Sequence, residues 1–139
     1  MIKSPILQAI AALIIPFIVL FGLYVQFHGD FSPGGGFQAG IIIASGVIFH
    51  AMLFGPAATL KAIPYSFIRI LSGMGVLIYM GTGIITMLLG AEFLSYNVLF
   101  TDNLTAQKIG IFTVELGVGL TVCSAMLIIY FSFAVRSRK

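Results

Sequence analysis

The sequence contains little charge. Only 8% of its 139 residues are Asp, Glu, Lys or Arg, whereas 60% are hydrophobic, and the mean hydropathy is +1.14. A water-soluble domain needs roughly a quarter of its residues charged to cover its surface. The scarcity of charge therefore excludes an ordinary soluble globular domain. It predicts that most of the surface faces lipid or other membrane subunits.

The residue types that build enzyme sites are also scarce. The single cysteine, Cys123, cannot form a disulfide within the chain, and there are only two histidines. No cysteine cluster, no pair of histidines at helical spacing and no Ser-His-Asp order is present. We therefore expect no enzyme activity, no metal centre and no cofactor. The net charge of +3 lies at loop ends and tails, so we expect no nucleic-acid partner.

Long apolar runs make up most of the chain. Each exceeds the ~20 residues that span the hydrocarbon core of a bilayer as a helix. The runs cover about residues 4–27, 35–55, 66–90 and 108–134. The sequence therefore predicts an all-α membrane protein, with one four-helix domain over residues 1–139.

The basic residues predict the orientation of these helices. Four crossings place both termini and the loop between the second and third helices on one side of the membrane. Six of the seven basic residues lie on that side, whereas Lys108 lies on the other. The six are Lys3, Lys61, Arg69, Arg136, Arg138 and Lys139. Because cytoplasmic loops carry the excess of Lys and Arg, both termini are expected in the cytoplasm.

A glycine-rich turn separates the first two apolar runs. Pro33 fixes its own φ and lacks a backbone donor, and the glycines at 34–36 place no side-chain constraint on the backbone. Irregular backbone at the edge of a bilayer is tolerated only where other protein covers it. We therefore expect segment 33–36 to be non-helical or loosely helical and to be covered by a partner.

Glu115 is the leading candidate for a functional residue. It lies about seven residues into the fourth predicted helix, ~10 Å below the outer end by helix rise. An ionisable group at that depth is costly unless it faces protein or water, which makes it a candidate for an ion or proton route. We expect it to face another helix or a neighbouring protein, and not lipid. A purely structural carboxyl, hydrogen-bonded to a neighbouring helix, is the alternative.

Three further residues are candidates for the same route. His50 lies in the second predicted helix, where it could relay protons or serve as a packed donor between helices. By helix rise its depth differs from that of Glu115 by roughly 10 Å, so a direct pair is not expected. His28 and Asp30 flank the glycine-rich turn and could collect cations at its outer mouth, or could simply be solvated turn residues.

The glycine-rich turn resembles the signature of a known family. Residues 27–40 read Phe-His-Gly-Asp-Phe-Ser-Pro-Gly-Gly-Gly-Phe-Gln-Ala-Gly. This is similar to Gly-His-x-x-Pro-Gly-Gly-Gly-Phe-x-x-Gly in the MnhB/MrpB family of small subunits of Mrp-type multisubunit Na⁺/H⁺ antiporters. His28 stands five residues before the proline instead of three. The positions that match are Pro33, Gly34, Gly35, Gly36, Phe37 and Gly40. The resemblance extends to 62–65 and to 114–117, where the family carries an acidic residue before Leu-Gly.

The resemblance implies a small subunit of a cation/proton antiporter complex in a prokaryotic plasma membrane. Its implied partners are the other subunits of that complex and the lipid bilayer, with Na⁺ and H⁺ as the transported ions. A subunit of this kind contributes to assembly and to the cation route. Homologous modules also occur in membrane-bound hydrogenase complexes, and the sequence does not separate these two settings.

Three functional hypotheses stay open at this point. The first is an ion-transport subunit in which Glu115 binds and releases protons or cations. The second is a purely structural subunit, in which the glycine-rich turn and the small-residue faces dock neighbours. The third is a self-sufficient small exporter. Four-helix exporters of this size carry their membrane carboxylate in the first helix, whereas the first helix here has no charge.

Overall fold

The computed structural model describes residues 4–29, 35–99 and 103–136, and within these residues it contains helices and no strand. Four helices are long and apolar enough to cross a membrane, which confirms the predicted all-α membrane fold. These are α1 (Pro5–Phe27), α2 (Gly35–Phe54), α4 (Tyr65–Leu88) and α5 (Asn103–Arg136). Two short helices lie between them, α3 (Pro56–Ala62) and the 3₁₀ helix η1 (Tyr96–Val98).

Proline and glycine fix several of the helix ends. Pro5 follows the N-cap Ser4, whose hydroxyl accepts a hydrogen bond from the Leu7 amide. Gly55 adopts a φ of 97° between α2 and α3, and Pro56 then starts α3. This short helix lies in the predicted second loop, because seven residues of mixed polarity give no spanning signal in the sequence.

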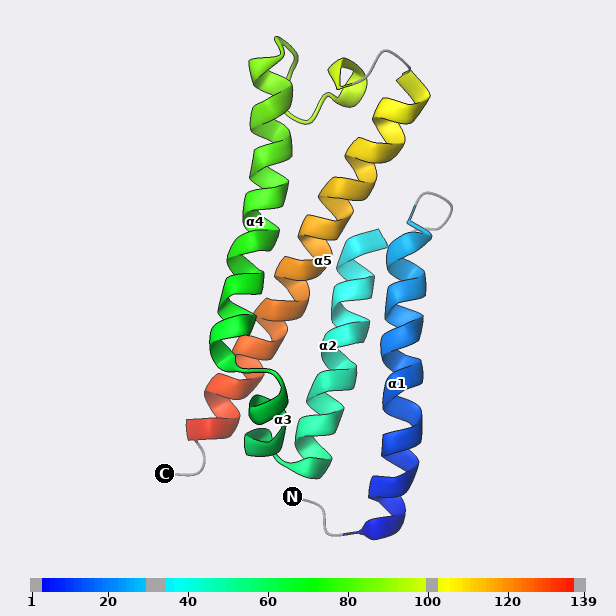
Figure 1. Cartoon of the computed structure of the whole chain (residues 1–139), viewed down its shortest axis with the longest axis vertical. Coiled ribbons are helices and arrows are strands. Elements are labelled where there is room, and N and C mark those ends of the chain that lie inside the picture. The colour runs from blue at the N-terminus through cyan, green and yellow to red at the C-terminus, as the bar shows by residue number, and fades with distance from the viewer. Residues whose placement is uncertain (1–3, 30–34, 100–102, 137–139) are drawn as a thin grey trace.

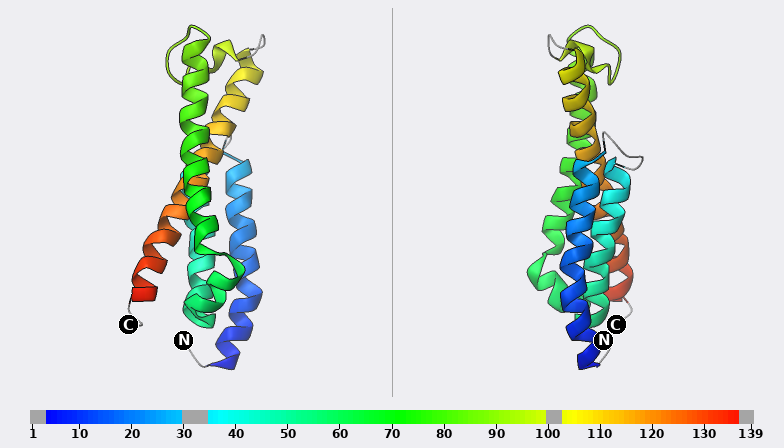
Figure 2. Two further views of the ribbon diagram at one scale, coloured as in Figure 1. Left: turned by 60° about the vertical axis from the view of Figure 1, so that its left-hand side comes forward. Right: turned by 90° about the vertical axis from the view of Figure 1, so that its right-hand side faces the viewer.

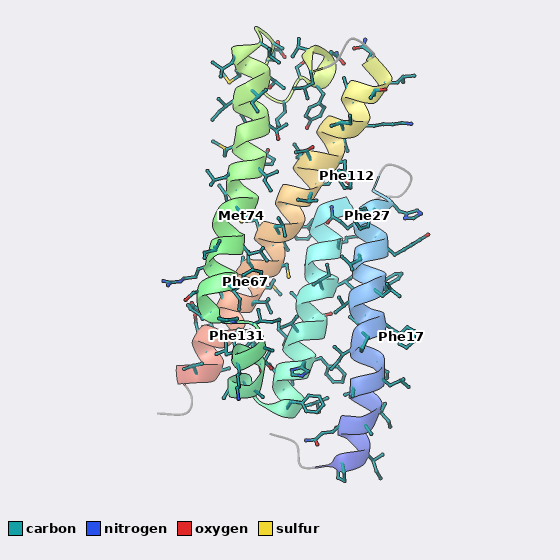
Figure 3. All side chains as sticks on the ribbon, viewed as in Figure 1. Phe17, Phe27, Phe67, Met74, Phe112 and Phe131 are labelled. Carbon is teal, nitrogen blue, oxygen red and sulfur yellow. The ribbon has the colours of Figure 1, made fainter. Side chains whose placement is uncertain are left out.

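The long helices form a single layer instead of a closed bundle. Helix α5 packs along α4 on one side and along α2 on the other, and α1 packs mainly on α2. The order across the layer is therefore α4, α5, α2, α1 (Figure 1). Seen from the side the layer is thin (Figure 2). The layer carries exposed apolar side chains such as Phe17 of α1 and Phe67 and Met74 of α4 (Figure 3).

Small residues allow the helices to approach closely at their crossings. A Cβ atom at Gly40 of α2 would lie 2.6 Å from the Gly119 carbonyl oxygen of α5. A Cβ atom at Gly75 of α4 would lie 2.7 Å from the Gly117 carbonyl oxygen of α5. Ala44, on the same face of α2 as Gly40, is fully buried. In a membrane, such small side chains let two helix backbones pack where no hydrophobic effect drives them together.

The α1–α2 pair meets α5 partway along its length. Figure 1 shows α4 and α5 continuing beyond the end of α1 and the start of α2. Glu115 lies against the first residues of α2 and comes twelve residues after Asn103, the start of α5. The rise of a helix makes this ~18 Å from the first residue of α5, compared with ~10 Å from the predicted helix start at residue 108. The difference arises because α5 begins five residues earlier than predicted, in polar turns that carry no hydropathy signal.

The structure describes two of the four residues of the glycine-rich segment. Gly35 and Gly36 are the first residues of α2, and both are buried against α5 of the same chain. The φ of 25° at Gly35 agrees with the expected loose helix at that residue, and cover by a partner stays a prediction. The other two residues of the segment, Pro33 and Gly34, lie outside the described residues. Glycine lets α2 start against α5 because it has no Cβ to collide with the neighbouring helix.

Candidate functional site

The carboxylate of Glu115 is enclosed by two glycines. A Cβ atom at Gly29, after the end of α1, would collide with this carboxylate. A Cβ atom at Gly35, the first residue of α2, would collide with it from the other side. The Glu115 side chain therefore faces α1 and α2 of the same chain and lies in a cradle that only glycine leaves open.

Two features of the backbone around Glu115 require glycine. Gly35 has a φ of 25°, in the left-handed region that side chains other than glycine rarely adopt. Gly36 approaches the backbone of α5 so closely that a Cβ atom there would overlap the Glu115 carbonyl oxygen. A side chain at Gly36 would therefore push the start of α2 away from the backbone of α5, and a side chain at Gly35 would displace the Glu115 carboxylate.

The start of α2 also determines the electrostatics of the site. The first amides of a helix have no intrahelical partner, and the helix dipole places partial positive charge at this end. The Glu115 carboxylate lies against the first residue of α2, so it occupies the position where a negative charge is favoured.

Gln26, in the last turns of α1, is a further polar residue of the site. Its side chain is 8% exposed, and its Oε1 atom lies 2.5 Å from where a Cβ atom of Gly119 would be. The Gly36 carbonyl oxygen lies 3.1 Å from the same position. The Gln26 Nε2 atom is buried and has no hydrogen-bond partner among the described residues.

Sequence patterns alone did not identify Gln26 as a site residue. The signal was available, because a glutamine in an apolar span, two residues before the glycine-rich turn begins, is a costly group to bury. Its proximity to α5, however, depends on how the α1–α2 pair lies against α5, and no local pattern encodes that register.

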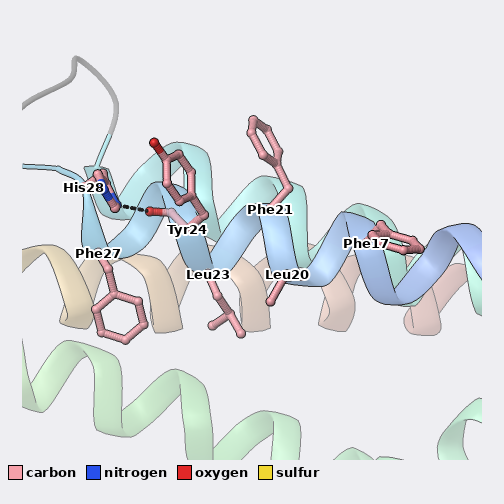
Figure 4. A pocket seen from close by; sticks show the side chains of 7 residues that line it. All are labelled: Phe17, Leu20, Phe21, Leu23, Tyr24, Phe27 and His28. Carbon is pink, nitrogen blue, oxygen red and sulfur yellow. Dashed lines mark hydrogen bonds between the residues drawn. The ribbon is translucent and has the colours of Figure 1, made fainter.

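His28 lies at the rim of the site but turns away from it. Its Nδ1 atom is 3.1 Å from the Tyr24 carbonyl oxygen, and its ring stacks on the Tyr24 ring at 4.1 Å (Figure 4). Both residues lie on the exposed face of α1. On the other side of α1, the Phe27 ring stacks on Phe112 of α5 at 5.8 Å (Figure 3). Asp30 lies outside the described residues.

His50 lies far from Glu115, at the opposite end of α2. It comes fourteen residues after Gly36, which corresponds to ~21 Å along the helix. Its Nδ1 atom is 2.9 Å from the Thr59 hydroxyl of α3, and its ring stacks on Phe54 at 4.6 Å. Thr59 also donates to the Gly55 carbonyl oxygen. The structure therefore places His50 at the α2–α3 corner and does not bring it to the site.

The acidic, histidine and cysteine side chains in the described part of the chain do not form a cluster. No group of three or more of them there could hold a metal ion. Among the described residues, the polar groups at the α1–α2–α5 junction include the Glu115 carboxylate, the Gln26 amide and the first amides of α2. This set can accept and release a proton, and it can fix the orientation of a carboxylate.

Comparison with known proteins gives a consistent result over most of the chain. The family model described as "Domain related to MnhB subunit of Na+/H+ antiporter" matches residues 6–128. Proteins from the Newman, JH1 and Mu3 strains of Staphylococcus aureus, each named "Putative antiporter subunit mnhB2", are 32% identical over 127 residues. The alignment covers 84% of this chain and 89% of each relative.

These matches include the glycine cradle, Gln26 and Glu115, and they accompany four helices of membrane-spanning length. The chain is therefore a multi-pass membrane protein that belongs to the MnhB family of antiporter-subunit domains.

Proposed function

We propose that this chain is a small membrane subunit of a multisubunit Na⁺/H⁺ antiporter complex in a prokaryotic plasma membrane. Its partners are the other subunits of that complex, and Glu115 forms part of the route for the transported ions. The chain contributes to transport as a subunit of a secondary transporter and performs no enzymatic step. Membership of the MnhB family and the names of the staphylococcal relatives support the antiporter setting.

The observation that carries the role of Glu115 is its position in the glycine cradle. A carboxylate in a membrane-spanning helix needs protein or water around it. Here it lies between Gly29 and Gly35, at the level where α1 ends and α2 begins. Irregular backbone at membrane depth is tolerated where it lines protein or a water-filled cavity. The same backbone could therefore admit water to the carboxylate.

The shape of the chain supports a function that needs partners. A single layer of helices has no interior that is closed on all sides, so an ion crossing beside it needs a second wall. The two faces of the layer expose large apolar side chains along every spanning helix. Neighbouring subunits would cover one of these faces and complete the route. The same argument disfavours a self-sufficient exporter.

A purely structural role is the second candidate, and one observation favours it. The Glu115 carboxylate touches both ends of the α1–α2 turn, so it could hold that turn on α5. In this case the complex, whether an antiporter or a related hydrogenase-type assembly, would need the shape of the side chain and not its charge.

Replacement of Glu115 by glutamine distinguishes the two roles, since it keeps the shape and removes the titrating group. We expect the Glu115→Gln complex to assemble, as measured by co-purification of all subunits, and to lose Na⁺-dependent proton movement in everted vesicles. Glu92→Gln is the matched control, because Glu92 is exposed in the loop after α4. Normal exchange in an assembled Glu115→Gln complex would support the structural role instead.

A further inference from the structure

We infer that Arg69 of α4 pairs with an aspartate or glutamate in a membrane helix of a neighbouring subunit, and that this helix packs on the face of α4 turned away from α5. The inference rests on the proposed assembly of the chain with other subunits and names one contact in that assembly. Three observations support it: a charge that no described residue neutralises, its depth in the layer, and the open face of α4 beside it.

Arg69 has no acidic neighbour among the described residues. Its side chain is exposed, and its guanidinium carbon lies 5.7 Å from the centre of the Tyr65 ring, one turn earlier in α4. No ion pair or hydrogen bond joins it to another residue in the described ranges. The acidic residues there are Glu92, which follows the far end of α4, and Glu115, which lies level with the start of α2. Both lie toward the opposite end of the layer.

The packing of the layer gives the level of Arg69. Ile68, the residue before it, shares one buried cluster with Ala51, near the end of α2. Helix α1 continues past the start of α4 at this end of the layer, as Figure 1 shows. The contact between Gly46 of α2 and Ile18 of α1 gives the register of these two helices. By helix rise, the first residue of α1 then lies ~12 Å beyond the level of Ala51.

The charge of Arg69 is costly at this depth. Beyond its level, α1 still exposes apolar side chains such as Ile6 and Ile10, which lipid or other protein must cover. An arginine inside a membrane-spanning surface needs a compensating group beside it. Lipid phosphates lie outside the hydrocarbon layer, whereas a carboxylate on a neighbouring helix can lie at the level of Arg69. The depth therefore favours a carboxylate of another subunit over a lipid phosphate.

The Arg69 guanidinium is well placed to bind a carboxylate. It lies over the Tyr65 ring, where cation–π attraction holds it. Its N–H donors lie in the plane of the group, so the ring does not occupy them. A carboxylate can accept two of these donors at once, and such bidentate pairs are strong.

The face of α4 beside Arg69 is open to a partner helix. Gly75 faces α5 and leaves no room for a side chain, whereas a Cβ atom at Gly73 would meet nothing within 4 Å. Leu77, one turn after Gly73, is 72% exposed. Arg69, Gly73 and Leu77 are spaced four residues apart, so they lie along one side of α4. A helix that packs on this side can approach the backbone of α4 at Gly73 and reach Arg69.

Photocross-linking tests what lies on this face. A photoreactive benzoylphenylalanine replaces Leu77 in the intact complex in native membranes, and mass spectrometry identifies the cross-linked peptide. We expect a membrane helix of another subunit that carries Asp or Glu ~12 Å from the cross-linked residue, which is the distance from Leu77 to Arg69 along α4. Cross-linking to lipid alone, to a helix without an acidic residue at that level, or to nothing would overturn the inference.

Substitution of Arg69 tests the charge pair. We expect Arg69→Gln to lower co-purification of the cross-linked subunit by ~10-fold or more, because the partner carboxylate would be left without a counter-charge. Neutralising that carboxylate should have the same effect. Lys61→Gln is the matched control, since Lys61 is exposed in the last turn of α3, outside the spanning helices. Normal co-purification in Arg69→Gln, or an equal loss in Lys61→Gln, would contradict the pair.

Exchange of the two charges separates loss of the pair from a folding defect. Arg69→Glu and replacement of the partner's acidic residue by arginine should each disrupt assembly, and the two together should restore it. No recovery in the double variant would overturn the direct pair. If the wild-type chain purifies without other subunits, the proposed function fails. If it purifies with them and Leu77 cross-links to lipid alone, only the inference for Arg69 fails.

Discussion

Individual glycines determine whether the site can exist. Side chains are excluded at Gly29 and Gly35 by the carboxylate of Glu115, and at Gly36 by its backbone. The glycine-rich turn was visible in the sequence, and the resemblance to the MnhB family drew attention to Gly35 and Gly36 but not to Gly29. What these glycines contact was not visible, because the contacts join residues about eighty positions apart.

The residue-scale prediction concerns Gly35. Alanine at this position would combine a positive φ, which costs ~1–2 kcal/mol, with a collision between its Cβ and the Glu115 carboxylate. We therefore expect Gly35→Ala to lower the stability of the complex by at least that amount and to impair exchange. Thermal unfolding of the purified complex in detergent would measure the change.

Gly73→Ala provides the matched control for this substitution. Gly73 lies within α4, and nothing lies within 4 Å of a Cβ atom added there. Because alanine favours a helix over glycine by up to ~1 kcal/mol, we expect neutral or slightly increased stability. If the Gly35→Ala complex were as stable as the Gly73→Ala complex, the close contact between Gly35 and the Glu115 carboxylate would be contradicted.

At the scale of the helices, close crossings hold the layer together. Helix α5 contacts α4 through Gly117 and contacts α2 through Gly119, and these two glycines lie on different sides of α5. Helix α5 is thus the central element of the layer, with Glu115 on the side that faces α2. The small residues Gly36, Gly40 and Ala44, spaced four apart in α2, were readable in the sequence, whereas the packing of this stripe on α5 was not.

The element-scale prediction concerns the α4–α5 crossing. A Cβ atom at Gly75 would lie within 3 Å of the Gly117 carbonyl oxygen and the Thr121 amide nitrogen, both of which belong to the backbone of α5. We expect Gly75→Ala to push α4 away from α5 and to destabilise the chain by ~1–3 kcal/mol. A shift in the thermal unfolding of the complex would report this loss, and Gly81→Ala, at an open position of α4, should show none.

At the scale of the whole molecule, the layer leaves much of its apolar surface to its surroundings. In each spanning helix, at most 33% of the most apolar 18-residue window is buried within the chain. Lipid and partner subunits must therefore cover the remainder. The candidate site lies at the junction of α1, α2 and α5, so we expect a neighbouring protein that covers this junction to control access to Glu115 as well.

The orientation of the layer in the membrane gives the third prediction. Both termini are expected in the cytoplasm, which places Lys61 of α3 inside and Lys108 of α5 outside. Both residues are exposed. We expect a membrane-impermeant maleimide to label Lys108→Cys in intact cells and to label Lys61→Cys only after permeabilisation. The native Cys123 is buried and should give little background. The reverse labelling pattern would invert the topology.

The sequence by itself determined the class of the protein, the four membrane spans and the family. These properties follow from hydropathy, run length and a glycine signature, all of which are local. The sequence also singled out Glu115, because a charge in an apolar run is visible without any structure. Short elements such as α3 and the polar start of α5 escaped the prediction, since neither carries a spanning signal.

Only the tertiary structure decided what surrounds Glu115. The cradle of Gly29 and Gly35, the burial of Gln26 beside Gly119, and the separation of His50 from the site all depend on how far the α1–α2 pair is displaced along α5. That register is set by small residues meeting across two helix interfaces. It is a property of contacts between distant segments, and no stretch of the sequence encodes it alone.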